Sequence, residues 1–321
     1  MRDNARMNTS LNRDVVLCEV GPRDGLQNTK TFMPTEQKKA WIAAEVACGV
    51  HEIEICSFVP AKLIPQFVDA AEIVAFANSI PELVSTVLVP NLRGFENAVA
   101  AGARRVAVPL SASEAHSQSN VRKSREAALA DFAAMVDANR AKPEHERATI
   151  VGAVATAFGC TIQGLVTEAD VIFMTEGILN AGADEVIVAD TVGYASPAQI
   201  KAIFTKVIRT IGPDVPLAAH FHDTRGLGIA NALAAYDVGV RHFDATLGGL
   251  GGCPYAPGAS GNVVMEDLAF AFEATGVRTG IDLDALIALR RTVFNDMAGL
   301  ETYGHLGLAG LPKGFEATTA A

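Results

Sequence analysis

Two histidines stand two residues apart, at positions 220 and 222, where the apolar run of PLAAHFHDTRG turns polar. In a β-strand, residues i and i+2 face the same side, so both imidazoles would point in one direction. Asp24 ends another apolar run, VVLCEVGPRD. Two imidazoles and a carboxylate suit a divalent cation with open positions, Mg²⁺ or Mn²⁺, and they do not exclude Zn²⁺. Asp223 is either a further ligand or an acceptor that orients an imidazole.

A cysteine among glycines marks a second stretch, GGLGGCPYAPGASGN, at positions 248–262. Such glycines can cradle a phosphate, but the Gly-Lys-Ser/Thr signature of a P-loop is missing. A plain flexible loop is the alternative interpretation. Because the stretch follows an apolar run, we interpret it as a mobile lid that carries a reactive thiol, Cys253.

Eight apolar runs alternate with segments of helical periodicity along the chain. Each run is nearly continuous in apolar residues, which is typical of parallel strands buried on both faces. Eight such units in 321 residues favour an α/β fold of the closed (β/α)8 TIM-barrel type over an open doubly wound sheet. The runs cover residues 15–24, 52–60, 83–91, 105–113, 149–158, 185–193, 216–223 and 242–252.

The domain boundaries follow from the same pattern. Residues 1–13 are interpreted as a disordered leader, and residues 14–321 as a single barrel domain. The part from about residue 281 predicts extra C-terminal helices packed on the barrel. In a barrel of this type, the active site lies at the carboxyl ends of the strands. We therefore expect one rim to collect the residues at which each run turns polar: Arg23, Asp24, Glu54, Ser57, Asn91, Ser111, Ser113, Cys160, Gln163, Asp190, Thr191, His220, His222 and 253–262.

Composition excludes several classes of partner. The formal net charge of −10 argues against nucleic acid, which normally selects a basic face. No apolar run approaches the ~20 residues of a membrane span. The five cysteines are odd in number and contain no CxxC, which favours a reducing compartment and predicts a cytoplasmic protein. A mitochondrial presequence is disfavoured because acidic residues stand among the few arginines of the first 14 residues.

Several long motifs, taken in order, resemble the 3-hydroxy-3-methylglutaryl-CoA lyase family, one of the metal-dependent lyases and Claisen-condensing enzymes built on TIM barrels. The likeness covers about residues 14–300. It implies cleavage of 3-hydroxy-3-methylglutaryl-CoA, or a close 3-hydroxy-3-alkylglutaryl-CoA, to acetyl-CoA and acetoacetate or the matching keto acid. It also implies a part in leucine degradation, and we expect a homodimer. The motifs are VGPRDGLQN (20–28), IEICSFV (53–59), VPNLRGFENAVAAGA (89–103), SASE (111–114), ADTVG (189–193), HFHDTRG (220–226) and the glycine-rich stretch at 248–262.

The resemblance also implies roles for single residues. The divalent ion, Mg²⁺ or Mn²⁺, would be held by Asp24, His220, His222 and Asn262. Arg23 would lie at the thioester carbonyl, Glu54 close to the metal, and Cys253 would be the mobile acid that protonates the enolate carbon. His220 would also have an acid–base part, and Asp190 matches an acid of the family site. We expect the acyl-CoA substrate to contact Arg23, Ser113, Gln163 and Thr191.

Two departures from the family pattern concern the choice of substrate. The sequence GCTIQG (159–164) stands where the lyases usually carry a GCPYEG-like stretch, and Arg225 follows HDT where another residue type is common. Both are expected at the mouth of the site, so a longer acyl group, such as the isohexenyl analogue, is an alternative. The GGLGGCPY loop speaks against a Claisen-type synthase, and the intact set of polar residues speaks against a non-catalytic binding barrel. A Schiff-base aldolase is disfavoured because no lysine falls at a strand end.

Overall fold

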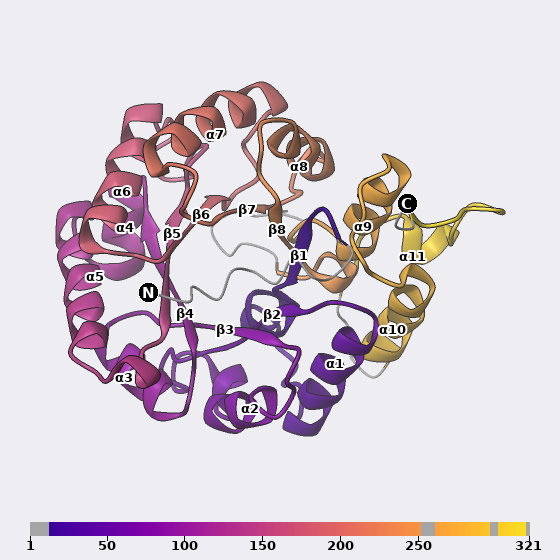
Figure 1. Ribbon diagram of the computed structural model, residues 1–321, viewed down its shortest axis with the longest axis horizontal. Helices are drawn as coiled ribbons and strands as arrows, with labels where there is room; N and C mark the ends of the chain where they lie inside the picture. Colours follow the sequence, from indigo (N-terminus) through magenta and orange to yellow (C-terminus); the bar gives the residue numbers. More distant parts are fainter. Residues whose placement is uncertain (1–12, 252–260, 296–300, 319–321) are drawn as a thin grey trace.

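Eight parallel strands close into a barrel in the order β1 to β8, with β8 paired back onto β1 (Figure 1). The computed structural model describes residues 13–251, 261–295 and 301–318. The predicted (β/α)8 barrel is confirmed, whereas residues 1–12 of the predicted leader lie outside the described residues. The strands are β1 (Val16–Glu19), β2 (Glu52–Ser57), β3 (Val84–Leu88), β4 (Arg105–Ser111), β5 (Thr149–Ala155), β6 (Glu185–Asp190), β7 (Leu217–Phe221) and β8 (His242–Ala245).

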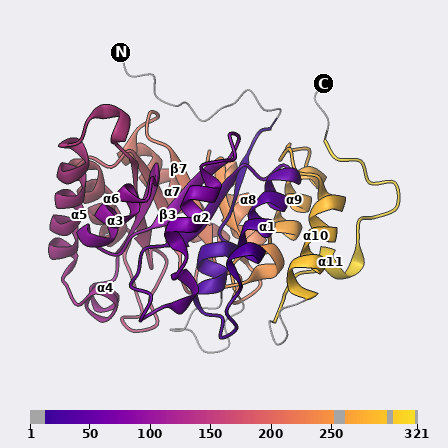
Figure 2. The same cartoon turned by 90° about the horizontal axis from the view of Figure 1, so that it is seen from below.

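Helices cover the outside of the barrel, and each strand leads to one or two of them. The eighth outer helix is α9, and beyond it α10 packs against both α1 and α9 (Figure 2). The predicted extra C-terminal helices are therefore present. The helices are α1 (Thr35–Ala47), α2 (Ala70–Ala77), α3 (Leu92–Ala100), α4 (Glu114–Val121), α5 (Arg125–Arg140), α6 (Glu168–Ala181), α7 (Pro197–Ile211), α8 (Gly228–Asp237), α9 (Met265–Ala274), α10 (Leu283–Asn295) and α11 (Leu306–Ala309). In the described part of the chain, no helix combines the length and apolar character that a membrane crossing requires.

Every strand is shorter than the apolar run that predicted it, and the first and last strands are shortened most. The run at 15–24 forms a strand only to Glu19, because the backbone then makes a π-helical turn over Gly21–Gly25. The run at 242–252 forms a strand only to Ala245, and a short turn at Leu247–Gly249 follows. Gly248 in that turn has φ +62°, a left-handed conformation that glycine adopts without strain. Both turns lie directly above the carboxyl ends of the strands, where the active site of such a barrel is expected.

A charged layer closes the amino-terminal end of the barrel interior. Arg105 of β4 donates to Glu52 Oε2 of β2 at 3.0 Å and pairs with Glu185 of β6. His242 of β8 lines the same interior, so all four even-numbered strands contribute. Branched aliphatic side chains usually fill such layers. Above this one, the interior is lined mainly by alanines and other small residues, which leave a cavity of about 160 Å³ that reaches the carboxyl-terminal rim.

Candidate active site

The turn after β1 carries two of the predicted site residues, Arg23 and Asp24. The Val20 carbonyl accepts hydrogen bonds from the N–H groups of Arg23, Asp24 and Gly25 at 3.2, 2.7 and 3.3 Å, which fixes the turn. Gly21 is required at its start, because a Cβ there would overlap a Glu19 carboxylate oxygen and would lie 2.8 Å from the Trp41 ring. The turn therefore places Arg23 and Asp24 together at the top of the barrel interior.

Arg23 is held between two carboxylates. Its Nε donates to Glu54 Oε2 of β2 at 2.6 Å, and its Nη1 donates to Asp24 Oδ1 at 2.6 Å. Burial lowers the pKa of Arg23, but Glu54 and Asp24 outweigh this effect and the net pKa is raised. Burial also raises the pKa of Asp24, but the positive charges of Arg23 and the site histidines outweigh it and lower this pKa to about 2. The turn thus presents a fixed guanidinium beside an ionised carboxylate.

His220 and His222 lie at the end of β7 with their ring centroids 5.2 Å apart. His220 Nδ1 lies 3.0 Å from Asp244 Oδ2 of β8, its partner in the strand register, so its Nε2 is the free nitrogen. His222 Nε2 lies 3.9 Å from Asp24 Oδ2. Burial, and then the charge of His220, lower the pKa of His222 to about 4, so this imidazole is neutral at pH 7. Burial lowers the pKa of His220 as well, but the hydrogen bond with Asp244 reverses the shift.

Asn262 reaches the cluster because the chain returns beside the end of β7. Val263 N–H donates to the Phe221 carbonyl and Asp223 N–H donates to the Gly261 carbonyl, both at 3.0 Å. This short antiparallel pairing sets Asn262 opposite His222. Asn262 Nδ2 donates to Asp24 Oδ2 at 2.7 Å. Its Oδ1 is buried and has no hydrogen-bond partner in the described part of the chain.

These four side chains fit a divalent cation. The possible ligand atoms of Asp24, His220 and His222 all lie within 4.8 Å of one another. Buried polar atoms normally have partners, so the unpaired Asn262 Oδ1 is an oxygen that suits a cation ligand. A donor set of imidazole nitrogen with carboxylate and amide oxygen suits Mg²⁺ or Mn²⁺ and does not exclude Zn²⁺. Asp223 is engaged elsewhere, since its Oδ1 accepts the Gly228 N–H at the start of α8 at 2.6 Å.

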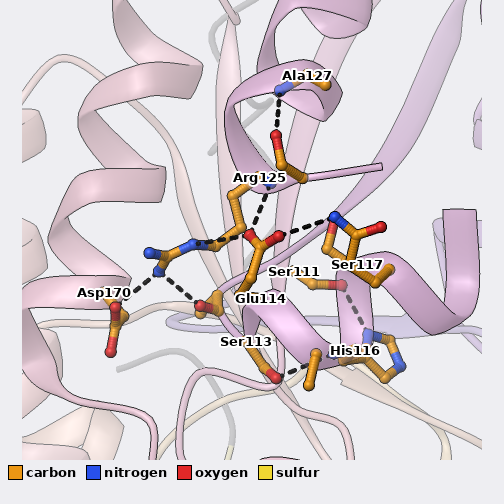
Figure 3. Close-up of polar contacts among 12 residues, drawn as sticks. Ser111, Ser113, Glu114, His116, Ser117, Arg125, Ala127 and Asp170 are labelled. Carbon is orange, nitrogen blue, oxygen red and sulfur yellow. Dashed lines mark hydrogen bonds and ion pairs between the residues drawn. The ribbon is translucent and has the colours of Figure 1, made fainter. Parts of the chain in front are cut away.

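Ser113 and Gln163 come together in the structure, and they bind each other. Ser113 begins α4, where its Oγ accepts the His116 N–H at 3.1 Å (Figure 3). The same Oγ donates to Gln163 Oε1 at 3.0 Å, and Gln163 Nε2 donates to the Leu165 carbonyl at 3.2 Å. Ser111 Oγ lies 2.6 Å from His116 Nδ1 and anchors the same helix start. Gln163 belongs to the GCTIQG stretch that departs from the family pattern, and it links the loop after β5 to the start of α4.

Three other predicted residues have different surroundings. Asp190 is buried, and its two carboxylate oxygens accept the Tyr194 and Ala195 N–H groups, each at 2.9 Å, so it shapes the loop after β6. Thr191 lines the cavity, and its Oγ1 accepts the Thr156 N–H at 2.9 Å. Cys253 lies outside the described residues.

Asp244 is a site residue that the sequence analysis did not select. It lies two residues after His242 in the last strand, where polar and apolar residues alternate in HFDA. That alternation places both polar side chains in the barrel interior. Asp244 was missed because only the residues at the polar end of each apolar run were considered, and Asp244 lies near the start of its run. Its contact with His220 depends on the register between β7 and β8.

Comparisons with known proteins give the family. The HMGL-like family matches residues 14–293. The cytoplasmic 3-hydroxy-3-methylglutaryl-CoA lyase of Rattus norvegicus is 39% identical over 269 residues, 84% of this chain and 77% of that protein. The (R)-citramalyl-CoA lyase of Chloroflexus aurantiacus is 40% identical over 284 residues, 85% and 88% of the two chains. A structure of an HMG-CoA lyase from Acinetobacter baumannii, in complex with coenzyme A and 3-methylmalate, is 41% identical and has a TM-score of 0.87, covering 94% of this chain and 97% of that one. The chain therefore belongs to the HMGL-like family and is an enzyme of the hydroxymethylglutaryl-CoA lyase kind.

Proposed function

We propose that this enzyme cleaves 3-hydroxy-3-methylglutaryl-CoA, or a close 3-hydroxy-3-alkylglutaryl-CoA, to acetyl-CoA and acetoacetate or the matching keto acid. The observation that carries the proposal is the Arg23 guanidinium, fixed 2.6 Å from both Glu54 and Asp24 and beside the Asp24, His220 and His222 cluster. A retro-Claisen cleavage needs a place to ionise the tertiary hydroxyl and a positive group at the thioester oxygen. The residue cluster and the Arg23 guanidinium would supply both in one site.

Each group has a chemical task in this reaction. Asp24, His220, His222 and Asn262 would hold Mg²⁺ or Mn²⁺, which lowers the cost of removing the hydroxyl proton when it is bound. The electron pair of the breaking C–C bond moves onto the thioester, which becomes an enolate. Arg23 stabilises that enolate oxygen, as an oxyanion hole does. Glu54 keeps the guanidinium in place. By the family resemblance, Cys253 then gives the enolate carbon its proton.

His220 has two proposed roles that compete for one nitrogen. Asp244 occupies its Nδ1, so both metal ligation and acid–base work would fall to Nε2. We propose ligation as its role in the resting enzyme, and during cleavage the same Nε2 would accept the proton that leaves the tertiary hydroxyl of the substrate. Asp190 remains proposed as a site acid only through the family resemblance, because two backbone N–H groups already occupy its carboxylate.

A panel of acyl-CoA thioesters tests the proposed reaction. With Mg²⁺ or Mn²⁺ present, 3-hydroxy-3-methylglutaryl-CoA should release acetyl-CoA, and analogues with a larger 3-substituent should be cleaved at rates that reveal the acyl preference. Citramalyl-CoA belongs on the panel because a relative of 40% identity is named for it. If no 3-hydroxy-3-alkylglutaryl-CoA releases acetyl-CoA, the proposed substrate class is wrong. The homodimer, the cytoplasmic location and the part in leucine degradation stay predictions.

Replacing Asp244 should weaken metal binding. Asp244→Asn keeps the side-chain shape but removes the charge that orients the His220 ring, and loss of such a support typically costs about 10–100-fold in metal affinity. The measurement is a Mn²⁺ titration followed by electron paramagnetic resonance, with thermal unfolding as a check of folding. Asp223→Asn is the matched control and should bind Mn²⁺ as the wild type does. If Asp223→Asn is the variant that loses Mn²⁺, Asp223 is the ligand.

A further inference from the structure

Two buried carboxyl groups meet behind the turn that carries Arg23 and Asp24. Glu19 is the last residue of β1, Glu45 lies in α1, and both are fully buried. Glu19 Oε1 lies beside the Trp41 ring, since both are within 2.8 Å of the point where a Cβ on Gly21 would stand. Glu45 contacts the same tryptophan through its Nε1–H, and a side-chain hydrogen bond links Glu45 to Glu19. Arg290, on the same side of the barrel, is paired with Glu266 at 2.9 Å. Two buried carboxyl groups in contact disfavour ionisation of both, because the two negative charges would repel each other in a medium of low dielectric constant.

The hydrogen bonds of the pair indicate where the proton lies. Glu19 Oε1 accepts the Gly21 N–H at 2.6 Å, and its Oε2 accepts the Leu247 N–H at 2.9 Å, so both of its oxygens act as acceptors. Glu45 Oε1 accepts the Trp41 Nε1–H at 2.9 Å. Glu45 Oε2 is buried and has no donor among the residues that the structure describes. An O–H at Glu45 Oε2 that donates to Glu19 would satisfy the last open position.

We infer that Glu45 is a positioning residue of the active site, which holds one proton at neutral pH and shares it with Glu19. Through Glu19 this hydrogen bond reaches two of the turns around the site. One is the Gly21–Gly25 turn with Arg23 and Asp24, and the other is the turn that begins at Leu247. The second turn leads to Gly251, where an added Cβ would lie 3.2 Å from Asp24 Oδ2.

The shared proton makes this arrangement sensitive to alkaline pH. Burial, and after it the neighbouring Glu266 charge, raise the pKa of Glu45 to about 8, and burial also raises the pKa of Glu19. The charged or titratable groups facing the pair from α9, α10 and α1 are Glu266, its partner Arg290, and Cys48.

The sign of the stability change follows from these shifts. The unfolded chain releases this proton near the ordinary carboxyl pKa of about 4.3, whereas the folded chain keeps it to about pH 8. The contribution of the pair to the free energy of unfolding is therefore fully present below about pH 4.3, and it is lost as the pH rises from there to about 8. Above it, two adjacent negative charges repel each other and pull Glu19 from its amide partners.

Glu45→Gln tests the inference, because the amide donates to Glu19 at every pH. In the wild type, Mn²⁺ affinity and kcat/KM should both fall above about pH 8. The decrease in kcat/KM should approach tenfold for each further pH unit. Glu45→Gln should keep the neutral-pH values and lack the fall in Mn²⁺ affinity. Loss of the Cys253 proton lowers kcat/KM at alkaline pH in both proteins, so the Mn²⁺ titration, which needs no turnover, decides the test. A fall in Mn²⁺ affinity that is identical in the two proteins overturns the inference, whereas absence of Mn²⁺ binding at neutral pH counts against the proposed metal site, on which this readout rests.

Infrared spectroscopy gives an independent readout. The wild type at neutral pH should show the C=O stretch of a buried protonated carboxylic acid, and Glu45→Gln should lose it. Glu273→Gln is the matched control, since this buried carboxylate accepts the Thr279 N–H and hydroxyl and lies outside the pair. The control should keep the band. If Glu45→Gln does not fold, the wild type alone decides, because absence of the band at neutral pH overturns the shared proton.

Discussion

Arg23→Met should lower kcat by about 10²–10³-fold, the cost of one lost oxyanion donor, while KM changes little. The reason is that Arg23 is fixed before substrate arrives. Two carboxylates hold its Nε and Nη1 at 2.6 Å each, so the guanidinium stabilises charge without first having to reorganise. Charge develops on the thioester oxygen only as the C–C bond breaks, so the lost interaction belongs to the transition state and should appear in kcat.

Two controls separate this role from simpler ones. Arg23→Met also leaves Glu54 and Asp24 without their cation, so Mn²⁺ affinity must be measured and the kinetics run at saturating metal. Arg23→Lys keeps the charge but loses the planar fork that bonds both carboxylates, and it should recover only part of kcat. A rise in KM with kcat unchanged would show that Arg23 only binds substrate.

Removal of divalent metal by EDTA should abolish turnover, and Mg²⁺ or Mn²⁺ should restore it. Asp24 is ionised and His222 is neutral at pH 7, so both are ready to bind a cation. The same binding should be visible without substrate. A ligand at 100 times its Kd that binds only the folded state adds about 2.7 kcal/mol to the free energy of unfolding, so Mn²⁺ should raise Tm.

Asp24→Asn gives the matched comparison for metal removal. It should lose both the Mn²⁺-dependent rise in Tm and the recovery of turnover, because it removes the carboxylate that Asn262 Nδ2 and His222 Nε2 face. Asp223→Asn should keep both. Full turnover in protein shown to be free of metal would exclude the proposed metal-assisted mechanism.

The barrel and much of the rim were predictable from sequence, because strands buried on both faces give long apolar runs whose polar ends converge. The i and i+2 spacing of His220 and His222 survives even though His222 lies just beyond β7, since its pairing with Asn262 keeps the backbone extended. The relative placement of these two histidines depends on local backbone geometry, and local geometry can be predicted from the spacing of residues in the sequence.

Contacts between residues of different strands and helices could not be predicted. Asp244 meets His220 only through the β7–β8 register, and Glu45 meets Glu19 only once α1 packs on β1. The hydrogen bond between Ser113 and Gln163 was not predicted, because the end of a strand does not determine where the next loop folds. Such contacts depend on tertiary packing rather than on the residue pattern of one segment.

The charged layer at the base of the barrel bears on how the chain reaches its native state. Arg105 lies in β4, and its two carboxylate partners come from β2 and from β6. A folding intermediate that contains only the first four strands would have Glu52 in place but not Glu185. In that intermediate Arg105 would keep only one of its two carboxylate partners, and its contact with Glu185 would form only when the second half of the barrel closes. Partly closed barrels are therefore penalised, and this ion pair favours cooperative folding of the two halves over a stable half-barrel.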